Sequence, residues 1–348
     1  MRANASALQQ RTGAALIPMV KADAYGVGAR AVARALESLA PYAFGVATVS
    51  EGEELRDAGI TRPILVFTPL LDDDLEAAAA ARLTPTLGSA ESIHAWRRFD
   101  APYHLAIDTG MNRAGVAWRD IASVADAVRE TPPAGAFTHF HSSELDDGSV
   151  AEQERRFREA LASLGVEIPF LHADNSAAAA RSRGGVWDAF RPGVFLYGVG
   201  SDADVAPSPV VTMRARIVDM RTIEPGDTVS YDATYRAPRR GRIATIALGY
   251  GDGYPRNASG RASALVRGQR VAIRGLVTMD MIMLDVTDVD CAIGDVVTLI
   301  GCDGDECITV EDVARDATMS PYELLTGLRG RLKRHYHDTG VAGGEISE

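Results

Sequence analysis

The stretch AALIPMVKADAYG (residues 14–26) carries the signals from which both the fold and the chemistry can be argued. Its apolar first half, Ala14 to Val20, predicts a buried strand, and Lys21 follows at the end of that strand, four residues before Tyr25. An amine in this place can lose its water shell and form a Schiff base, which is the chemistry of pyridoxal phosphate (PLP). A single lysine is more often a surface residue, so the rest of the chain must decide between the two interpretations.

The first 200 residues alternate between two kinds of pattern. Apolar runs predict eight strands, at 14–20, 42–49, 63–68, 83–87, 103–107, 136–140, 170–172 and 190–197. Segments with a helical period lie between them, at 29–39, 75–81, 121–129 and 152–164. Ser50 and Glu53 predict a capping box at the start of a further helix. Strands that alternate with helices pair in parallel, so eight such units predict a closed (β/α)8 barrel, with an open doubly wound sheet as the alternative.

The pattern changes after residue 200. Short β-rich runs take over, at 210–220, 242–248, 264–266, 271–273, 281–286 and 296–300. Turn signals such as Glu-Pro-Gly-Asp (224–227) separate them, which predicts a second, mainly antiparallel domain ending in a helical segment at 310–328. We therefore expect a barrel domain at 1–199 and a β-rich domain at 200–348. The polar, proline-bearing stretch 202–209 is the expected linker.

Composition restricts the partners. The net charge of −11 disfavours nucleic acid or an anionic membrane as the main partner, because the overall field repels polyanions. No apolar run approaches the roughly 20 residues that span a bilayer, and residues 1–11 lack the apolar core of a signal peptide, so we expect a cytoplasmic protein. Three cysteines, an odd number, argue against a disulfide scaffold, and we expect Cys302 and Cys307 in a loop rather than at a metal.

Polar residues gather at the carboxyl ends of the expected barrel strands. They are Lys21, Asp108, Met111, Asn112, Arg113, His139, His141, Asn175, Ser176, Arg191, Gly193 and Val194. Each has an ordinary structural explanation by itself: Asn175 and Ser176 could cap a helix, and His139 could be a hydrogen-bonded core residue. Because active sites of β/α barrels lie at that end of the strands, the group as a whole predicts a pocket.

At this point the chain resembles the alanine racemase family, PLP enzymes with a barrel and a β domain. The matching motifs run in family order along nearly the whole chain: VKADAYG (20–26), DTGMNRAG (108–115), THF (138–140), NS (175–176), RPGV (191–194), SYDATY (230–235), GYGDGY (249–254) and MD (279–280). The first motif alone would indicate only a PLP barrel. The tyrosine motifs of the second domain resemble a racemase specifically.

The resemblance implies a two-base mechanism. To invert a Cα centre, one group must remove a proton from one face and another must return a proton to the opposite face. Lys21 would bind PLP and act on the face of the D enantiomer, and Tyr231 would act on the face of the L enantiomer. His139 and Arg191 resemble the groups that support Tyr231, and Arg191 would also face the pyridine nitrogen of PLP, where a donor-only guanidinium limits transamination.

The resemblance also implies the binding residues. Those for the cofactor are Lys21, Tyr25, His139, Asn175, Ser176, Arg191, Gly193 and Val194. Arg113 would meet the substrate carboxylate, and Met279 and Tyr250 would complete the substrate site. In the family Tyr231, Tyr250 and Met279 reach the barrel of the opposite subunit, which implies a homodimer with composite sites. The substrate would be alanine or another small amino acid such as serine, and the product D-alanine for peptidoglycan.

Three positions depart from the family pattern. Ala106 replaces a lysine, often carbamylated, that holds the arginine corresponding to Arg113, and Gly330 replaces a tyrosine that touches the phosphate. The start of the chain is also short, since the family has a further strand before the first helix.

Three other classes of protein share part of this pattern. A non-catalytic PLP barrel would lack a domain that carries Tyr231, and a decarboxylase of the same fold would be expected to carry a catalytic cysteine late in the chain. A metal-dependent hydrolase is suggested only by His139 and His141, without a further ligand set, and we expect no metal.

Overall fold

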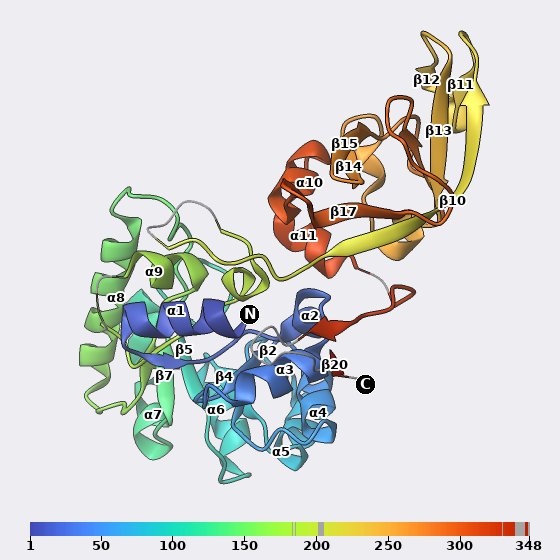
Figure 1. The fold of residues 1–348 in the computed structure, drawn as a ribbon. Coiled ribbons are helices and arrows are strands. Elements are labelled where there is room, and N and C mark those ends of the chain that lie inside the picture. The colour runs from blue at the N-terminus through green and yellow to red at the C-terminus, as the bar shows by residue number, and fades with distance from the viewer. Residues whose placement is uncertain (183, 185, 201–204, 329, 338–344, 347–348) are drawn as a thin grey trace. The chain divides into compact units, whose positions relative to one another are not determined.

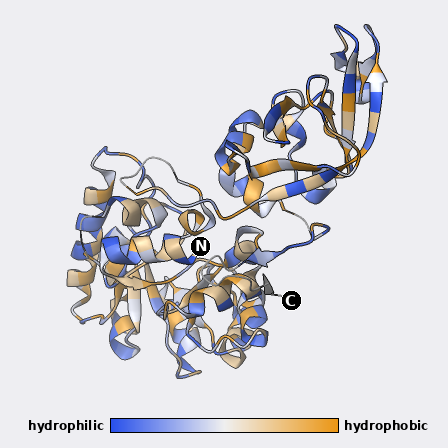
Figure 2. Cartoon of the chain, viewed as in Figure 1, coloured by the Kyte–Doolittle hydropathy of each residue, from blue (hydrophilic) through white to orange (hydrophobic). Residues whose placement is uncertain are grey.

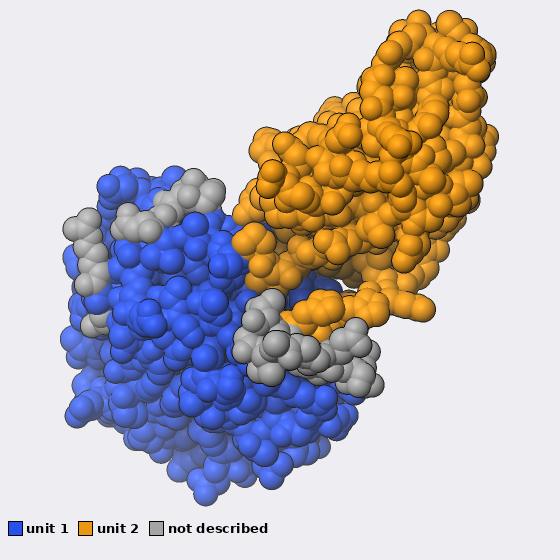
Figure 3. Space-filling view, in the orientation of Figure 1, with its two compact units in different colours: residues 1–208 blue, residues 209–348 orange. Residues whose placement is uncertain are grey.

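The structure is a computed structural model that describes residues 1–348 except 183, 185, 201–204, 329, 338–344 and 347–348. The chain forms two compact units, Met1–Ser208 and Pro209–Glu348 (Figure 3). Residues 202–204 of the expected linker lie outside the described residues.

The first unit is a ring of parallel strands surrounded by helices (Figure 1). Its strands are β1 (Ala15–Leu16), β2 (Phe44–Val46), β3 (Ile64–Val66), β4 (Thr84–Leu87), β5 (His104–Asp108), β7 (Gly135–Phe137), β8 (Leu171–His172) and β9 (Ala189–Phe190). They pair in the order β1-β9-β8-β7-β5-β4-β3-β2, and the short β6 (Val116–Ala117) pairs with β5. Parallel contacts between Met19 and Gly45 join the two ends of this path, which confirms the expected barrel over the open sheet.

Helices alternate with the strands. They are α1 (Arg2–Thr12), α3 (Ala29–Glu37), α4 (Val49–Asp57), α5 (Asp72–Ala80), α6 (Ala90–Arg97), α7 (Ala125–Glu130), α8 (Ser149–Leu164) and α9 (Ser176–Arg181). Of these, α3, α4, α5, α7 and α8 lie at or overlap the segments where the patterns predict helices. Helix α8 shows why: its buried residues Gln153, Phe157, Ala160 and Leu164 are three or four positions apart, so they share one face. Gly165 ends this helix in the left-handed conformation.

One fully buried cluster in the barrel core consists of Ile17, Ala43, Leu65 and Ala189. Leu65 and Ala189 lie in β3 and β9, and Ile17 and Ala43 are directly next to β1 and β2. Burying an aliphatic side chain of the size of Ile17 stabilises a fold by about 1.5 to 3 kcal/mol. Colouring by hydropathy shows that helices around the sheet carry hydrophobic and hydrophilic residues together (Figure 2). The apolar runs of the sequence are therefore the strands that close the barrel.

The second unit is mainly antiparallel, as expected. Its main sheet has the order β15-β14-β17-β10-β13-β16, with β18 paired to β17. These strands are β10 (Met213–Ile223), β13 (Gly241–Ile246), β14 (Ser263–Val266), β15 (Gln269–Ala272), β16 (Ile282–Asp285), β17 (Val296–Asp303) and β18 (Glu306–Ile308). Strand β10 pairs with β17 through its first half and with β13 through its second half.

Short elements complete the second unit. They are β11 (Thr228–Val229), β12 (Tyr235–Arg236), β19 (Tyr336–His337), β20 (Glu345–Ile346), α10 (Val310–Asp316), α11 (Pro321–Thr326) and the 3₁₀ turns η3 (Tyr231–Ala233), η4 (Tyr250–Asp252) and η5 (Arg256–Ala258). The helical pattern at 310–328 is thus two helices. Thr318 is left-handed between them, and Ser320 and Pro321 start the second one, so the helical period continues across a break.

Three local expectations were wrong in detail. The capping box of α4 uses Thr48 and Glu51, because Thr48 is the extended residue whose hydroxyl accepts from the Glu51 N–H; Ser50 lies inside the helix. The strand predicted at 190–197 ends at Phe190, and Val194–Tyr197 forms the 3₁₀ turn η2. The helix predicted at 121–129 begins as the 3₁₀ turn η1 (Trp118–Val124) before α7.

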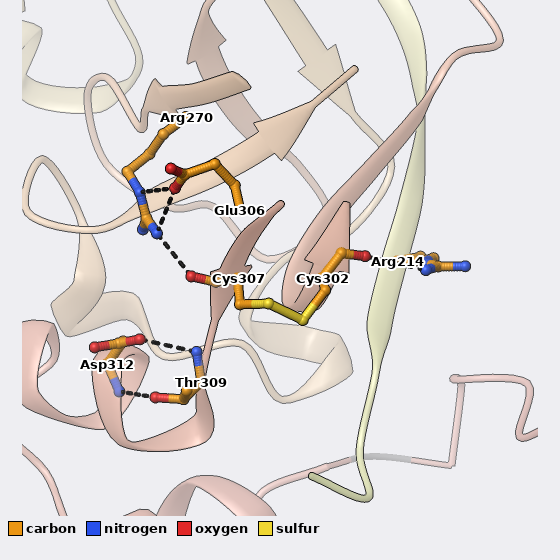
Figure 4. The surroundings of a disulfide bond; sticks show 7 residues. All are labelled: Arg214, Arg270, Cys302, Glu306, Cys307, Thr309 and Asp312. Atoms are coloured by element: carbon orange, nitrogen blue, oxygen red, sulfur yellow. Dashed lines mark hydrogen bonds and ion pairs between the residues drawn. A yellow bond between two sulfur atoms is a disulfide. The ribbon is translucent and has the colours of Figure 1, made fainter. Parts of the chain in front are cut away.

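Cys302 and Cys307 form a disulfide, so they do not lie in a loop as free thiols (Figure 4). They are paired opposite one another in the hairpin of β17 and β18. Spacing did not reveal this bond, because the strand register that brings the two residues together is set by the sheet. Cys291 is a buried free cysteine.

None of the described helices combines the length and the apolar character needed to cross a membrane.

Candidate active site

Lys21 follows β1 at the carboxyl end of the barrel, where the sequence places it. Burial, and then the nearby charge of Arg113, lower the pKa of its amine, while Glu51 acts in the opposite direction. A lysine with a lowered pKa is deprotonated more often and is a better nucleophile. The chain contains only one other lysine, Lys333. Lys21 therefore has the environment that a carbonyl-binding amine needs.

The segment directly after Lys21 has an unusual backbone. Element α2 (Lys21–Tyr25) is a turn in which Ala22, Asp23, Ala24 and Tyr25 all have φ between 51° and 56°. Left-handed residues other than glycine cost roughly 1 to 2 kcal/mol each. The turn is held from outside, because the N–H of Ala22 donates to Glu51 at 2.7 Å and the carboxylate of Asp23 accepts from the N–H of Ala29 at 2.8 Å. Strain of this kind is typical of functional sites.

Tyr25, Ser176 and Gly193 lie together. The Tyr25 ring is buried and stacks on Tyr197, with ring centroids 4.7 Å apart. A Cβ built on Gly193 would lie 2.3 Å from the Tyr25 hydroxyl oxygen, so only glycine fits here. The Ser176 hydroxyl accepts from the Gly193 N–H at 2.8 Å. Two hydroxyl groups thus converge on a loop that has no side chain at its centre, which suits a bound phosphate.

Asn175 has a structural task in the same place. Its side-chain oxygen accepts from the N–H groups of Ala177 and Ala178, both at 3.1 Å, and so caps α9. A direct contact of Asn175 with a cofactor stays a prediction.

Arg191 is buried and surrounded by acceptors. It donates to the carbonyl oxygens of Thr138 at 2.8 Å and Ala173 at 2.9 Å, and its guanidinium lies 2.8 Å from Nδ1 of His172. His139 Nδ1 lies further away, at 3.5 Å. Burial lowers the pKa of Arg191 to about 9, which leaves it charged at neutral pH. It is a fixed positive charge whose orientation the backbone determines.

His172 and His104 extend the hydrogen-bond network of Arg191. Since Arg191 can only donate, His172 accepts through Nδ1 and carries its proton on Nε2, from which it donates to His104 Nδ1 at 2.8 Å. Burial, then Arg191, lowers the pKa of His104 to about 4 and that of His172 well below its usual range. The same causes, followed by Arg113 and Lys21, lower the pKa of His139 to about 3. All three rings are neutral at pH 7.

Arg113 lies in the loop that follows β5. Its side chain is exposed and makes no hydrogen bond or ion pair with the described residues. Ala106 is buried beneath this loop, and a Cβ on Gly115 would lie 2.8 Å from the Ala106 carbonyl oxygen. The loop is therefore packed closely on β5, while the Arg113 side chain is available to a ligand. His141 is also exposed, and its ring lies 2.7 Å from the Ser142 hydroxyl.

The second unit carries the other predicted residues, Tyr231, Tyr250 and Met279. All three side chains are exposed, Tyr231 to 70%. The segments of Tyr250 and Met279 are joined by backbone hydrogen bonds, Tyr250 N–H to Thr278 at 3.0 Å and Gly251 N–H to Met279 at 2.8 Å. Arg331 holds the same two segments by ion pairs with Asp252 at 2.9 Å and Asp280 at 2.8 Å.

Sequence reasoning missed several residues that support the site. The spacing of Ser50 and Glu53 conceals the capping role of Glu51, and no motif distinguishes His172 and His104 from ordinary strand residues. The available signal was a histidine on each of two barrel strands, His104 at the start of β5 and His172 at the end of β8. The role of the two histidines depends on Arg191, which only the fold brings next to His172.

Comparisons with known proteins agree along the chain. Two family models match, "Alanine racemase, N-terminal domain" at residues 1–201 and "Alanine racemase, C-terminal domain" at residues 210–336. An alanine racemase of Deinococcus radiodurans is 40% identical, with 95% of each chain covered, and one of Halothermothrix orenii is 38% identical, covering 92% of this chain and 89% of the relative.

Two solved structures are similar over the same length. Alanine racemase from Bacillus anthracis with bound L-Ala-P has a TM-score of 0.91 at 29% identity and covers 99% of this chain and 94% of that one. Alanine racemase from Bartonella henselae with covalently bound pyridoxal phosphate has a TM-score of 0.87 at 28% identity, with 96% of each chain covered.

Proposed function

The chain belongs to the alanine racemase family, and from this premise we propose that it interconverts L- and D-alanine with PLP bound to Lys21, using Lys21 and Tyr231 as the two bases. The observation that carries the proposal is Lys21 itself. Its amine is partly buried beside Arg113, its pKa is lowered, and it precedes a strained turn that leads to Tyr25.

The residues of the first unit fit the cofactor. The space that a Cβ on Gly193 would fill, between Tyr25 and Ser176, supports binding of the phosphate there by the two hydroxyls and the backbone of Gly193 and Val194. His139, Asn175 and Arg191 complete the proposed cofactor site. When bound, PLP withdraws electrons from the Cα atom of the attached amino acid and so makes the Cα proton acidic.

Two groups of this chain move the proton. Lys21 removes it from the D enantiomer and Tyr231 removes it from the L enantiomer, and each group returns a proton to its own face in the reverse direction. Since a phenol is a weak acid, Tyr231 needs positive charge or hydrogen bonds near it, which His139 and Arg191 supply in the proposal. Arg113 receives the substrate carboxylate, and Met279 and Tyr250 restrict the side chain to a small one.

Arg191 has a second task toward the cofactor. Its guanidinium has donors only and is held by two backbone carbonyls, so toward the pyridine nitrogen of a bound cofactor it would act as a hydrogen-bond donor. A donor in this place would disfavour a proton on that nitrogen and so would disfavour transamination as a side reaction.

The proposal includes a homodimer, in which Tyr231, Tyr250 and Met279 of one subunit complete the site of the other. All three side chains are exposed and so are accessible to a second subunit. We expect dilution to the monomer to abolish activity, measured by sedimentation and by rate at matched concentrations. A fully active monomer would refute this part. The further proposal that the product D-alanine serves peptidoglycan synthesis in the cytoplasm rests on the family alone.

The test of the function uses the small number of lysines. Purified protein is incubated with PLP, reduced with borohydride, and its peptides are weighed; Lys21 should carry the label and Lys333, the other lysine, should not. Racemisation rates over a panel of L-amino acids should be highest for alanine, with serine next. Protein that stays colourless and unlabelled at Lys21 would exclude the mechanism. A preference for lysine or arginine would exclude the substrate and leave the chemistry intact.

A further inference from the structure

The carboxylate of Glu51 connects two segments of the first unit. One oxygen accepts from the N–H of Ala22 and the other from the N–H of Ala47, both at 2.7 Å, and the second oxygen also lies 3.4 Å from the N–H of Thr48. Each of these groups is a donor, so the side chain must present an acceptor on both sides. Only a carboxylate does so, because the amide of glutamine has one acceptor and one donor.

The first of these contacts fixes the peptide bond that follows Lys21. Ala22 is the first of four left-handed residues, with φ 52°, and none of the four is glycine. Such a backbone persists only where its surroundings hold it. The Ala22 N–H is the point at which α4 holds the start of the turn, and the second oxygen anchors the same carboxylate to Ala47, next to the end of β2.

Glu51 also differs in charge from the other groups near Lys21. The charged side chains that act on this amine are Arg113 after β5 and Glu51 on α4, and His139 after β7 is a titratable neighbour whose own pKa the charge of Lys21 lowers. Burial and Arg113 lower the pKa of Lys21, and Glu51 is the carboxylate that opposes them.

We propose that Glu51 is a positioning residue for Lys21, which it serves by holding the left-handed turn with one carboxylate oxygen and the end of β2 with the other. The inference rests on the proposed function, in which Lys21 is the cofactor-binding base. The competing explanation is that Glu51 only caps α4, because it also completes the capping box with Thr48.

Four variants separate the two explanations. Glu51→Gln removes one of the two acceptors and the charge. Thr48→Ala weakens the cap of α4 without touching Lys21. Glu54→Gln, a matched control on the same helix, breaks only an exposed pair with Arg30. The double variant Glu51→Gln, Ala22→Gly also lacks one acceptor and the charge of Glu51. It places glycine at residue 22, where φ is positive, which makes the left-handed turn easy to adopt.

The first readout is made on the protein without cofactor and needs no activity. The pH dependence of amine labelling at Lys21 is followed by peptide mass spectrometry, with Lys333 as the internal reference. In Glu51→Gln the labelling midpoint should move to lower pH, because the carboxylate that favours the ammonium form is gone. Thr48→Ala and Glu54→Gln should keep the midpoint of the parent chain.

The second readout is the rate constant on alanine. We expect Glu51→Gln to lower kcat about tenfold with KM nearly unchanged, and Ala22→Gly on that background to restore most of kcat while the labelling midpoint stays shifted. Thr48→Ala should lower thermal stability only. The inference is wrong if Thr48→Ala shifts the labelling midpoint of Lys21 and lowers kcat as Glu51→Gln does. It is also wrong if Ala22→Gly restores no kcat on the Glu51→Gln background, or if the labelling midpoint of Glu51→Gln stays at that of the parent chain or moves to higher pH. A parent chain that fails to bind PLP at Lys21 would instead remove the proposed function.

Discussion

Replacing Gly193 with alanine tests the phosphate site most directly. The new Cβ would lie 2.3 Å from the Tyr25 hydroxyl oxygen and 3.0 Å from the ring carbon that bears it. Contact at an ordinary distance requires the oxygen to move by about 1 Å. The ring cannot move away freely, because it is buried and stacked on Tyr197, whose own hydroxyl donates to the Met19 carbonyl at 2.9 Å. Forcing a methyl group into such a place costs about 1 to 3 kcal/mol.

Most of this cost should appear in cofactor binding, because the Tyr25 hydroxyl would leave the place where it meets the phosphate. At 1.4 kcal/mol for each factor of ten, the affinity for PLP should fall roughly 10- to 100-fold. Protein freed of cofactor is titrated with PLP, and the dissociation constant is taken from the absorbance of the bound cofactor. A thermal melt of each variant without cofactor shows that it is folded.

The control removes the clashing atom. Tyr25→Phe loses the hydroxyl and should weaken PLP binding by itself, but Gly193→Ala should cost much less on the Tyr25→Phe background than on the parent chain. Strictly additive effects of the two substitutions, or a Gly193→Ala variant that binds PLP like the parent, would show that Tyr25 and Gly193 do not form one site.

Further predictions concern the second base, the buried histidines and the disulfide. Tyr231→Phe should lower kcat about 10²- to 10⁴-fold in both directions while solvent deuterium still exchanges into D-alanine through Lys21; retention of full activity would contradict the two-base proposal. The folded pKa of His104 is about 4, below its ordinary value, so below pH 6.5 the unfolded chain binds a proton that the folded chain does not. The free energy of unfolding should therefore fall as the pH drops from about 6.5 to 4, by roughly 3 kcal/mol from this group. Urea unfolding at pH 7 and at pH 4.5 should show a smaller loss of this free energy in His104→Gln than in the parent chain. Equal losses in the two proteins would contradict the assignment. Reducing the bond between Cys302 and Cys307, which are five residues apart, should destabilise the second unit by about 2 kcal/mol and leave kcat unchanged at 25 °C. A thermal melt with and without reductant, next to the Cys302→Ser variant, checks it, and an unchanged melting temperature would count against the bond.

Much of the fold could be predicted because its signals are local. Apolar runs at 42–49 and 63–68 contain the strands β2 and β3, and the buried face of α8 follows the helical period. Errors appeared where a local signal had two solutions. Ser50 and Glu53 have the spacing of a capping box, but Thr48 is the residue with the extended backbone that a cap requires.

The candidate site was predictable as a set of residues and not as a set of contacts. The carboxyl ends of parallel strands meet at one end of a barrel, so polar residues there could be grouped without coordinates. The individual contacts could not be predicted, since Arg191 and Thr138 are 53 residues apart in sequence, while the Arg191 guanidinium lies 2.8 Å from the Thr138 carbonyl oxygen. Ser176 and Gly193 meet in the same way across 17 residues.

The amino-acid order alone determined the alternation of strands and helices and the change to short antiparallel strands after residue 200, and it predicts Lys21 as the reactive amine, because periodicity and motif spacing are properties of neighbours along the chain. Only the tertiary structure decided that the turn at Ala22 is left-handed, that His104 and His172 support Arg191, and that Cys302 faces Cys307. The physical reason is that alanine has no local preference for a positive φ and a histidine none for an arginine. Such arrangements are imposed by distant groups, here the carboxylate of Glu51 and the register of the sheets, and they exist only after the chain has closed on itself.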